Sequence, residues 1–135
     1  MIYLDSAAVV KLVRSEPASA ALVDWLDERS GAPLIASAVV EVEVPRALQR
    51  SAPEALPLVP ATLALLYRLE IDPIVRAMAA AYAEPGLRSL DAIHLATAQL
   101  VAGDSDDAFE AFVTYDKKLL AAAAGIGLPT ESPGA

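Results

Sequence analysis

The fold is most constrained by a regular alternation of short apolar segments with longer stretches of helical periodicity. Apolar segments of strand length lie at 2–4, 33–36, 67–71 and 111–115. Stretches with helical spacing or capping lie at 7–14, 18–29, 37–51, 62–66, 73–83, 90–102 and 117–124. Strands that alternate with helices favour a mainly parallel sheet with helices on both faces. We therefore predict an α/β fold.

Length and composition indicate one compact domain. The chain has 135 residues, 56% of them hydrophobic, which suits a single core; we place the domain at 1–130 and a C-terminal tail at 131–135. The absence of cysteine excludes disulfides and thiolate metal sites. No apolar run reaches the length of a membrane span, and the N-terminus lacks the pattern of a secretion signal. We expect a cytoplasmic protein with no membrane contact.

The net charge of -8 at first disfavours a nucleic-acid partner, since phosphate binding normally needs an excess of Lys and Arg. Carboxylates that gather divalent cations change this expectation, because the bound ions reverse the local sign of charge. Net charge alone therefore does not exclude a metal-dependent nuclease.

Three acids are predicted to meet at one edge of the sheet. Asp5 and Asp116 each follow a predicted strand, and sites in parallel sheets form beyond the carboxyl ends of the strands. Asp91 lies in the first turn of a helix that begins near Ser89, where the helix dipole favours a carboxylate. Ser6 is expected to cap the helix that follows Asp5.

A fourth acid comes from the helix predicted at 37–51, in which Glu41 and Glu43 point to nearly opposite sides. Glu43 has apolar neighbours one turn before and after it, such as Val39 and Ala47, and so projects from an inward face. We take Glu43 as the site residue and Glu41 as the alternate.

Grouped carboxylates repel one another, and bound cations remove that cost. Ligation by oxygen alone suits Mg²⁺ or Mn²⁺. The chemistry that matches is hydrolysis of a phosphodiester, with metal ions activating water and stabilising the leaving oxygen.

Four sequence blocks in order resemble those of one known family. They are the segment from Ile2 to Ser6, Ser37 followed six residues later by Glu43 and then Arg46-Ala47-Leu48, the segment from Leu87 to Ala98, and Val113-Thr114-Tyr115-Asp116 before Lys117. In these blocks the chain resembles a PIN-domain ribonuclease of the VapC toxin type, over nearly its whole length.

The resemblance implies that Asp5, Glu43 and Asp91 are catalytic metal ligands, and that Asp116 completes the site directly or through water. It implies that Ser6 and Thr114 support these acids by hydrogen bonds. It also implies RNA as the substrate, with transfer or ribosomal RNA as the expected class. A VapB-type antitoxin is the expected partner, which would bind an apolar groove on the early helices, and a homodimer is expected.

Other residues have weaker expectations. Arg46, Arg50 and Lys117 are the preferred candidates for RNA contacts. His94 is interpreted as a helix-packing residue, and the acidic segment 104–107 as a solvated loop. Two alternative functions are a catalytically inactive PIN-like binding module and a phosphoacceptor-type signalling domain.

Overall fold

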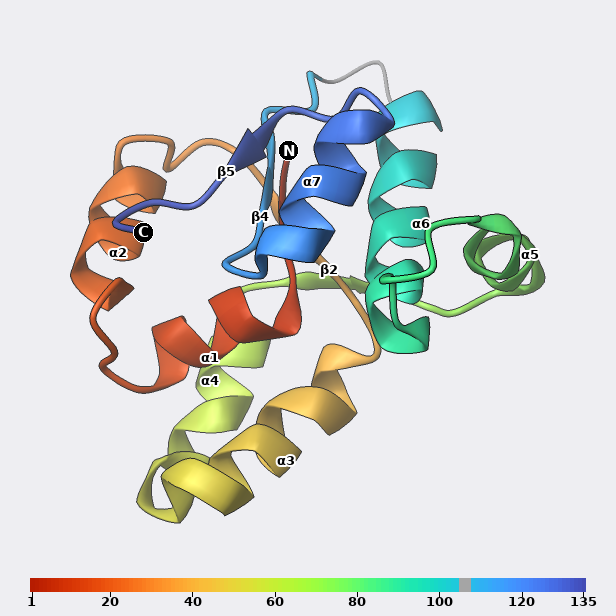
Figure 1. The fold of residues 1–135 in the computed structure, drawn as a ribbon. Helices are drawn as coiled ribbons and strands as arrows, with labels where there is room; N and C mark the ends of the chain where they lie inside the picture. The colour runs from red at the N-terminus through yellow and green to blue at the C-terminus, as the bar shows by residue number, and fades with distance from the viewer. Residues whose placement is uncertain (105–107) are drawn as a thin grey trace.

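A five-stranded parallel sheet forms the centre of the molecule (Figure 1). The computed structural model describes residues 1–104 and 108–135. The strand order is β3-β2-β1-β4-β5. The strands are β1 (Ile2–Leu4), β2 (Leu34–Ser37), β3 (Tyr67–Leu69), β4 (Ala111–Val113) and β5 (Thr130–Glu131). The expected parallel α/β architecture is thus confirmed.

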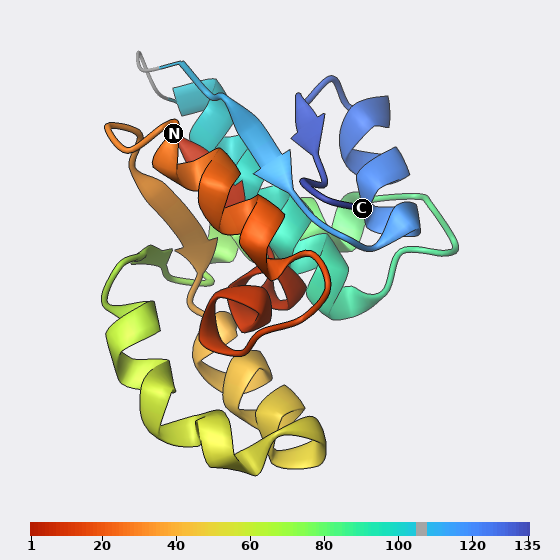
Figure 2. The ribbon, with the colours of Figure 1, turned by 90° about the vertical axis from the view of Figure 1, so that its left-hand side faces the viewer.

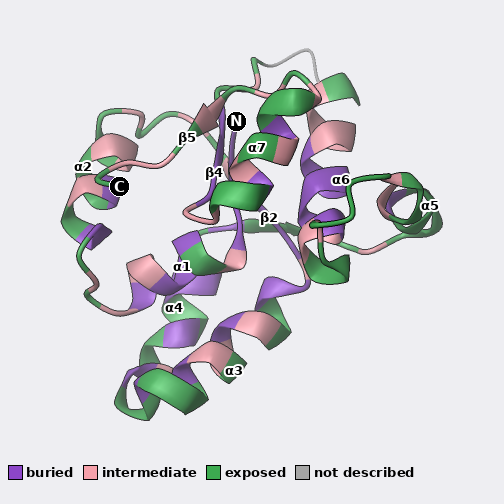
Figure 3. Ribbon diagram, viewed as in Figure 1, coloured by how far each residue is buried: buried purple, intermediate pink, exposed green. Residues whose placement is uncertain are grey.

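The alternation of side chains along β1 divides the core into two halves. Ile2 and Leu4 pack into one apolar cluster, while Tyr3 between them packs into the other. All three are fully buried, as Figure 3 shows for the central strands. Because β1 is buried on both faces, its sequence does not alternate between apolar and polar residues.

Helices cover both faces of the sheet, as expected. On the side of Ile2 and Leu4 lie α1 (Ser6–Val13), α2 (Ser19–Asp27), α3 (Val40–Ser51), the 3₁₀ helix η1 (Pro53–Leu58) and α4 (Val59–Leu63). On the side of Tyr3 lie α6 (Ser89–Asp104) and α7 (Lys117–Gly125), with α5 (Pro73–Ala81) packed against α6. Figure 2 shows α3 and α4 as neighbouring helices that extend beyond the sheet.

Several helix starts differ from the sequence prediction. Ser6 does not cap α1; the side chain of Asp5 does, by accepting a hydrogen bond from the Ala8 N–H. Ser37 ends β2, and α3 begins at Val40 after a short turn. In that turn the Ser37 hydroxyl accepts from the Val39 N–H, so serine stabilises the turn before the helix.

The edges of the sheet also differ. Strand β5 was not predicted, because two residues after Pro129 give no periodic signal; it pairs with β4 and brings Glu131 into the sheet. At the other edge, β3 ends at Leu69, and both Tyr67 and Arg68 are exposed. The helix predicted at 62–66 is replaced by η1 and α4. Helix α6 reaches Asp104, and the remainder of the predicted acidic loop lies outside the described residues.

Within the described residues, no helix is both long and apolar enough to cross a bilayer. The elements that matter for chemistry are those that begin beyond the carboxyl ends of β1, β2 and β4. Helices α1, α3 and α7 follow those strands along the chain, and α6 lies beside α7 (Figure 1). Their first turns bring polar side chains to one edge of the sheet.

Candidate active site at the carboxyl edge of the sheet

Asp5 is a buried carboxylate at the end of β1, with only 4% of its surface exposed. The parallel register pairs Leu4 with Val113, so the residues that follow them, Asp5 and Thr114, come side by side. Asp5 Oδ1 accepts from the Ala8 N–H at 2.9 Å, and Oδ2 accepts from the Thr114 hydroxyl at 2.5 Å. Burial raises the pKa of Asp5 above its ordinary value, although these hydrogen bonds oppose the shift.

Thr114 connects two of the acids. Its hydroxyl, which is fully buried, donates to Asp5 and accepts from the Asp116 N–H at 3.1 Å. The Asp116 side chain caps α7, since its Oδ1 accepts from the N–H groups of Lys118 and Leu119. One threonine hydroxyl therefore ties the buried acid of β1 to the start of α7.

Glu43 projects from the first turn of α3 toward the same edge. Its Oε1 accepts from the Ser6 hydroxyl at 2.6 Å and lies 2.8 Å from His94 Nε2. Burial alone would raise the pKa of Glu43, but the hydrogen bonds from His94 and Ser6 outweigh it and lower the pKa. Both bonds end on Oε1, so they fix the carboxylate without using Oε2.

His94 is buried and links Glu43 to the core. Its Nδ1 lies 2.8 Å from the Tyr3 hydroxyl, which also accepts from the Ser37 N–H at 3.2 Å. Burial, followed by the charge of Asp5, raises the pKa of Tyr3 well above its ordinary value, so its hydroxyl keeps its proton. The contacts of both His94 ring nitrogens are hydrogen bonds when the Tyr3 hydroxyl donates to Nδ1 and the protonated Nε2 donates to Glu43.

Asp91 lies in the first turn of α6 and completes the acidic edge. Burial and then the neighbouring Asp116 carboxylate raise the pKa of Asp91, and the charge of Glu43 adds to the effect. Asp91 also contributes to the raised pKa of Asp5. Its nearest cation is Arg88, with Nε 3.8 Å from Oδ2. All four predicted acids therefore lie within electrostatic reach of their neighbours.

The four acids do not form a finished metal-binding group. Among the described residues, no three Asp, Glu or His side chains come close enough together to hold one ion. In this arrangement Glu43 Oε1 is engaged by Ser6 and His94. The donors still fit Mg²⁺ or Mn²⁺ in kind, because all of them are carboxylate oxygens.

Glu41 and the predicted RNA contacts lie away from this core of the site. Glu41 forms an ion pair with Arg68 at 3.4 Å on the exposed side of α3, so the orientation of the helix favours Glu43. Arg46 and Arg50 are exposed on α3. Lys117, in contrast, lines a cavity together with Asp91 and Asp116.

The contacts that His94 and Tyr3 make at the site were not predicted from the sequence. The spacing of His94, one helical turn after Asp91, puts both on one side of α6 and was the available signal. The Tyr3 hydroxyl offered no such signal, because a tyrosine in a buried strand is an ordinary core residue.

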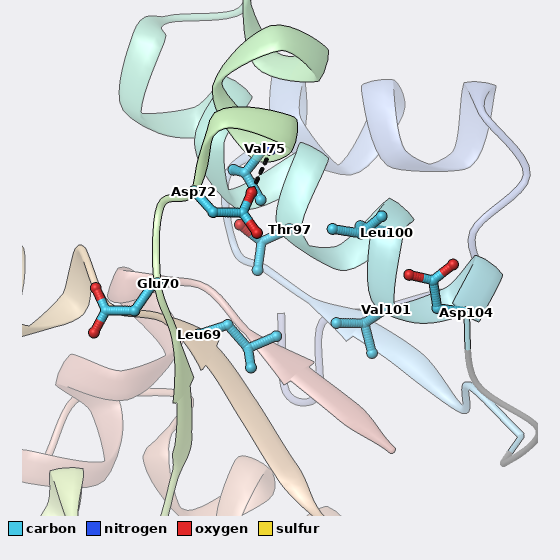
Figure 4. A pocket seen from close by; sticks show the side chains of 8 residues that line it. All are labelled: Leu69, Glu70, Asp72, Val75, Thr97, Leu100, Val101 and Asp104. Carbon is cyan, nitrogen blue, oxygen red and sulfur yellow. Dashed lines mark hydrogen bonds between the residues drawn. The ribbon is translucent and has the colours of Figure 1, made fainter.

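Two cavities differ in character. One of about 620 Å³ adjoins the acidic edge and is lined by Asp91, Asp116 and basic side chains. The other, of about 430 Å³, lies between β3, α5 and α6 (Figure 4). It combines aliphatic side chains with carboxylates such as Glu70 and Asp72, and it includes none of the predicted site residues. The acidic edge is thus the site at which predicted residues and a polar cavity coincide.

Comparison with known proteins gives a consistent result. Residues 2–125 match the PIN domain family. The chain is 54% identical over 134 residues to the protein named ribonuclease VapC35 from Mycobacterium tuberculosis, covering 99% of this chain and 98% of that protein. This similarity does not favour the phosphoacceptor or inactive alternatives.

Solved structures show the same fold. VapC20 of Mycobacterium tuberculosis, described as a sarcin-ricin loop cleaving toxin, superposes with a TM-score of 0.75 at 13% identity, covering 98% of this chain and all of that one. A chain of VapBC2 from Rickettsia felis, bound to a fragment of promoter DNA, gives 0.67 at 14% identity and covers 98% and 99%. At such identities the likeness concerns the fold alone.

Proposed function

Because this chain belongs to the PIN-domain family, we propose that it is an endoribonuclease toxin that hydrolyses RNA phosphodiester bonds with Mg²⁺ or Mn²⁺. The observation that carries the proposal is the full-length similarity to a protein named as a ribonuclease. The gathering of Asp5, Glu43, Asp91 and Asp116 at one edge supports it, because an oxygen-only donor set suits the required ions.

In this proposal Asp5, Glu43 and Asp91 hold the metal, with Asp116 completing the site directly or through water. A bound divalent ion supplies the chemistry by activating an attacking water and stabilising the leaving oxygen. The raised pKa values of Asp5 and Asp91 reflect burial and neighbouring carboxylates, and a cation relieves both costs.

The other residues orient the acids. Thr114 and the Ala8 N–H hold the two oxygens of Asp5, which fixes the plane of that carboxylate. Ser6 and His94 do the same for Glu43 through Oε1. Hydrogen-bonded partners of metal ligands fix ligand geometry and raise metal affinity.

The proposed partner is a VapB-type antitoxin, supported by the full-length similarity to a protein named VapC35. A cavity of about 390 Å³ beside α1 and α2 is lined mostly by apolar side chains such as Leu12, Val23, Leu26 and Leu65, together with the polar Asp27, Arg29 and Ser30. It suits an apolar segment of such a partner. We further propose a homodimer that acts on RNA in the cytoplasm, with transfer or ribosomal RNA as substrate.

The test is incubation of purified protein with total cellular RNA, with and without Mg²⁺ or Mn²⁺, followed by mapping of the cut ends. Asp5→Asn keeps the shape of the side chain but removes its charge, and Asp24→Asn on the exposed side of α2 is the matched control. We expect cleavage that needs the ion, survives in Asp24→Asn and is lost in Asp5→Asn. Equal cleavage by Asp5→Asn would contradict the proposal.

A further inference from the structure

We propose that the cavity lined by Arg88, Lys117 and Lys118 binds a backbone phosphate of the RNA next to the bond that is cut. This inference rests on the proposed function. It adds the direction in which the RNA chain leaves the acidic edge, namely across this cavity. The cavity also contains Asp91 and Asp116, so a phosphate held there is adjacent to the acidic edge.

The cavity is richer in basic side chains than the chain as a whole. The chain carries ten Lys and Arg against eighteen Asp and Glu, yet three of those basic residues line this one cavity with two acids. The three come from two separate segments, the turn before α6 and the start of α7. The fold therefore assembles a basic surface that neither segment provides alone.

The basic groups are available to a ligand. The Arg88 side chain is 84% exposed, and its Nε lies 3.8 Å from Asp91, beyond hydrogen-bond distance. Among the residues that the structure describes, no ion pair within 4.0 Å involves Lys117 or Lys118. Side chains that are not paired within the protein lose little when they bind a phosphate.

Lys118 is directed across the turn that borders the cavity. Its Cδ would lie 3.7 Å from a Cβ at Gly86, so its hydrocarbon stem lies over that glycine. A lysine stem on the protein surface leaves the ammonium group in solvent at the rim. The stem of Lys118 thus lies along the turn at the edge of the cavity.

Helices α6 and α7 both begin at this cavity, since Arg88 precedes Ser89 and Lys117 is the first residue of α7. The Asp116 carboxylate already accepts from the first N–H groups of α7, and Asp91 lies in the first turn of α6, so both helix ends are offset by acids of the protein. The attraction for a phosphate therefore comes from the three basic side chains.

The first experiment measures the salt dependence of RNA binding. A short fluorescein-labelled single-stranded RNA is titrated with protein in Mg²⁺ at several salt concentrations, in an Asp5→Asn background, with gels to check that the probe stays intact. The variants are R88Q, K117Q and K118Q and their combination. The control is R76Q, which removes one exposed positive charge on α5.

Losing the one bound phosphate is expected to reduce the slope of log K against log salt by about 0.7 for single-stranded RNA. The triple variant should therefore lose about 0.7 units of slope, and R76Q none. Unchanged melting temperatures will show that the variants fold. A triple variant whose slope equals that of R76Q overturns the proposal, whereas cleavage by Asp5→Asn would instead refute the proposed function.

The second experiment removes the charge from the RNA. Once a cut site is mapped, substrates are made with an uncharged methylphosphonate linkage on the 5′ or the 3′ side of the cut bond. Wild-type protein should cleave one of the two more slowly, and the triple variant should cleave both equally relative to the unmodified RNA. If the triple variant keeps the full sensitivity of the wild type, the phosphate is bound elsewhere and the proposal fails.

Discussion

Replacing Thr114 with valine tests how the buried acid is held in place. Valine keeps the β-branched shape required at the end of β4 but lacks the hydroxyl that donates to Asp5 and accepts from the Asp116 N–H. Thr114 is fully buried, so water cannot readily replace the lost group. We expect Thr114→Val to destabilise the protein and to disturb the position of the carboxylate.

The magnitude follows from the two bonds. A hydrogen bond to a charged group contributes about 1.5–3 kcal/mol. The Asp116 N–H is only partly buried, so leaving it without a partner costs about 1 kcal/mol, the lower end of the usual range. The added methyl group recovers roughly 1 kcal/mol by burial. The net loss in free energy of unfolding should be about 1.5–3 kcal/mol.

Urea denaturation followed by circular dichroism measures this loss, with chelator present so that metal binding does not contribute. The same substitution in an Asp5→Asn background completes a double-mutant cycle. Because the charge-assisted bond is already gone there, the cost of Thr114→Val should fall by at least about 1 kcal/mol. Additive costs in the two backgrounds, or a loss below about 0.5 kcal/mol, would refute the reasoning.

Three further predictions concern the acids. At neutral pH, without divalent ions, Asp5→Asn should be more stable than wild type, because the folded protein no longer buries a charge. The raised pKa of Asp5 means that its protonated form stabilises the fold below the unfolded pKa of about 3.9, and that this contribution is lost as pH rises through the folded pKa. The difference in free energy of unfolding between the variant and wild type, measured by denaturation, should therefore close toward pH 4. EDTA should abolish RNA cleavage and added Mg²⁺ or Mn²⁺ should restore it; cleavage that persists in chelator speaks against metal dependence. His94→Asn, which withdraws the Nε2 contact from Glu43, should weaken Mn²⁺ binding in calorimetry by about 10–100-fold, and unchanged affinity would show that His94 does not position the ligand.

The central part of the fold could be predicted because its signals are local. The run Ile2-Tyr3-Leu4 is too short and too apolar for anything but a strand buried on both faces, and the structure pairs it on both sides. Strand β5 carried no such signal, since Thr130 and Glu131 are paired only because β4 presents a free edge. The start of α3 was also misplaced, because Ser37 stabilises a turn as readily as a helix cap.

The four acids and the supporting hydroxyls of Ser6 and Thr114 were predicted, but the supporting contact of His94 was not. An acid after a buried strand can be placed at the sheet edge from the sequence, as Asp5 was. The bond from His94 to Glu43 joins residues 51 positions apart, and its existence depends on how α3 and α6 are oriented. The basic cavity depends likewise on the contact between the turn before α6 and the start of α7, which no local pattern encodes.

The central claim is that Asp5, Glu43 and Asp91 jointly bind a divalent ion. Anomalous X-ray scattering from crystals soaked in Mn²⁺ tests it most directly, because the manganese position is seen independently of any activity. We expect a manganese peak within ligand distance, about 2.0–2.5 Å, of oxygens from these three carboxylates. Manganese bound only elsewhere on the protein, or contacting none of the three at saturating concentration, would contradict the account.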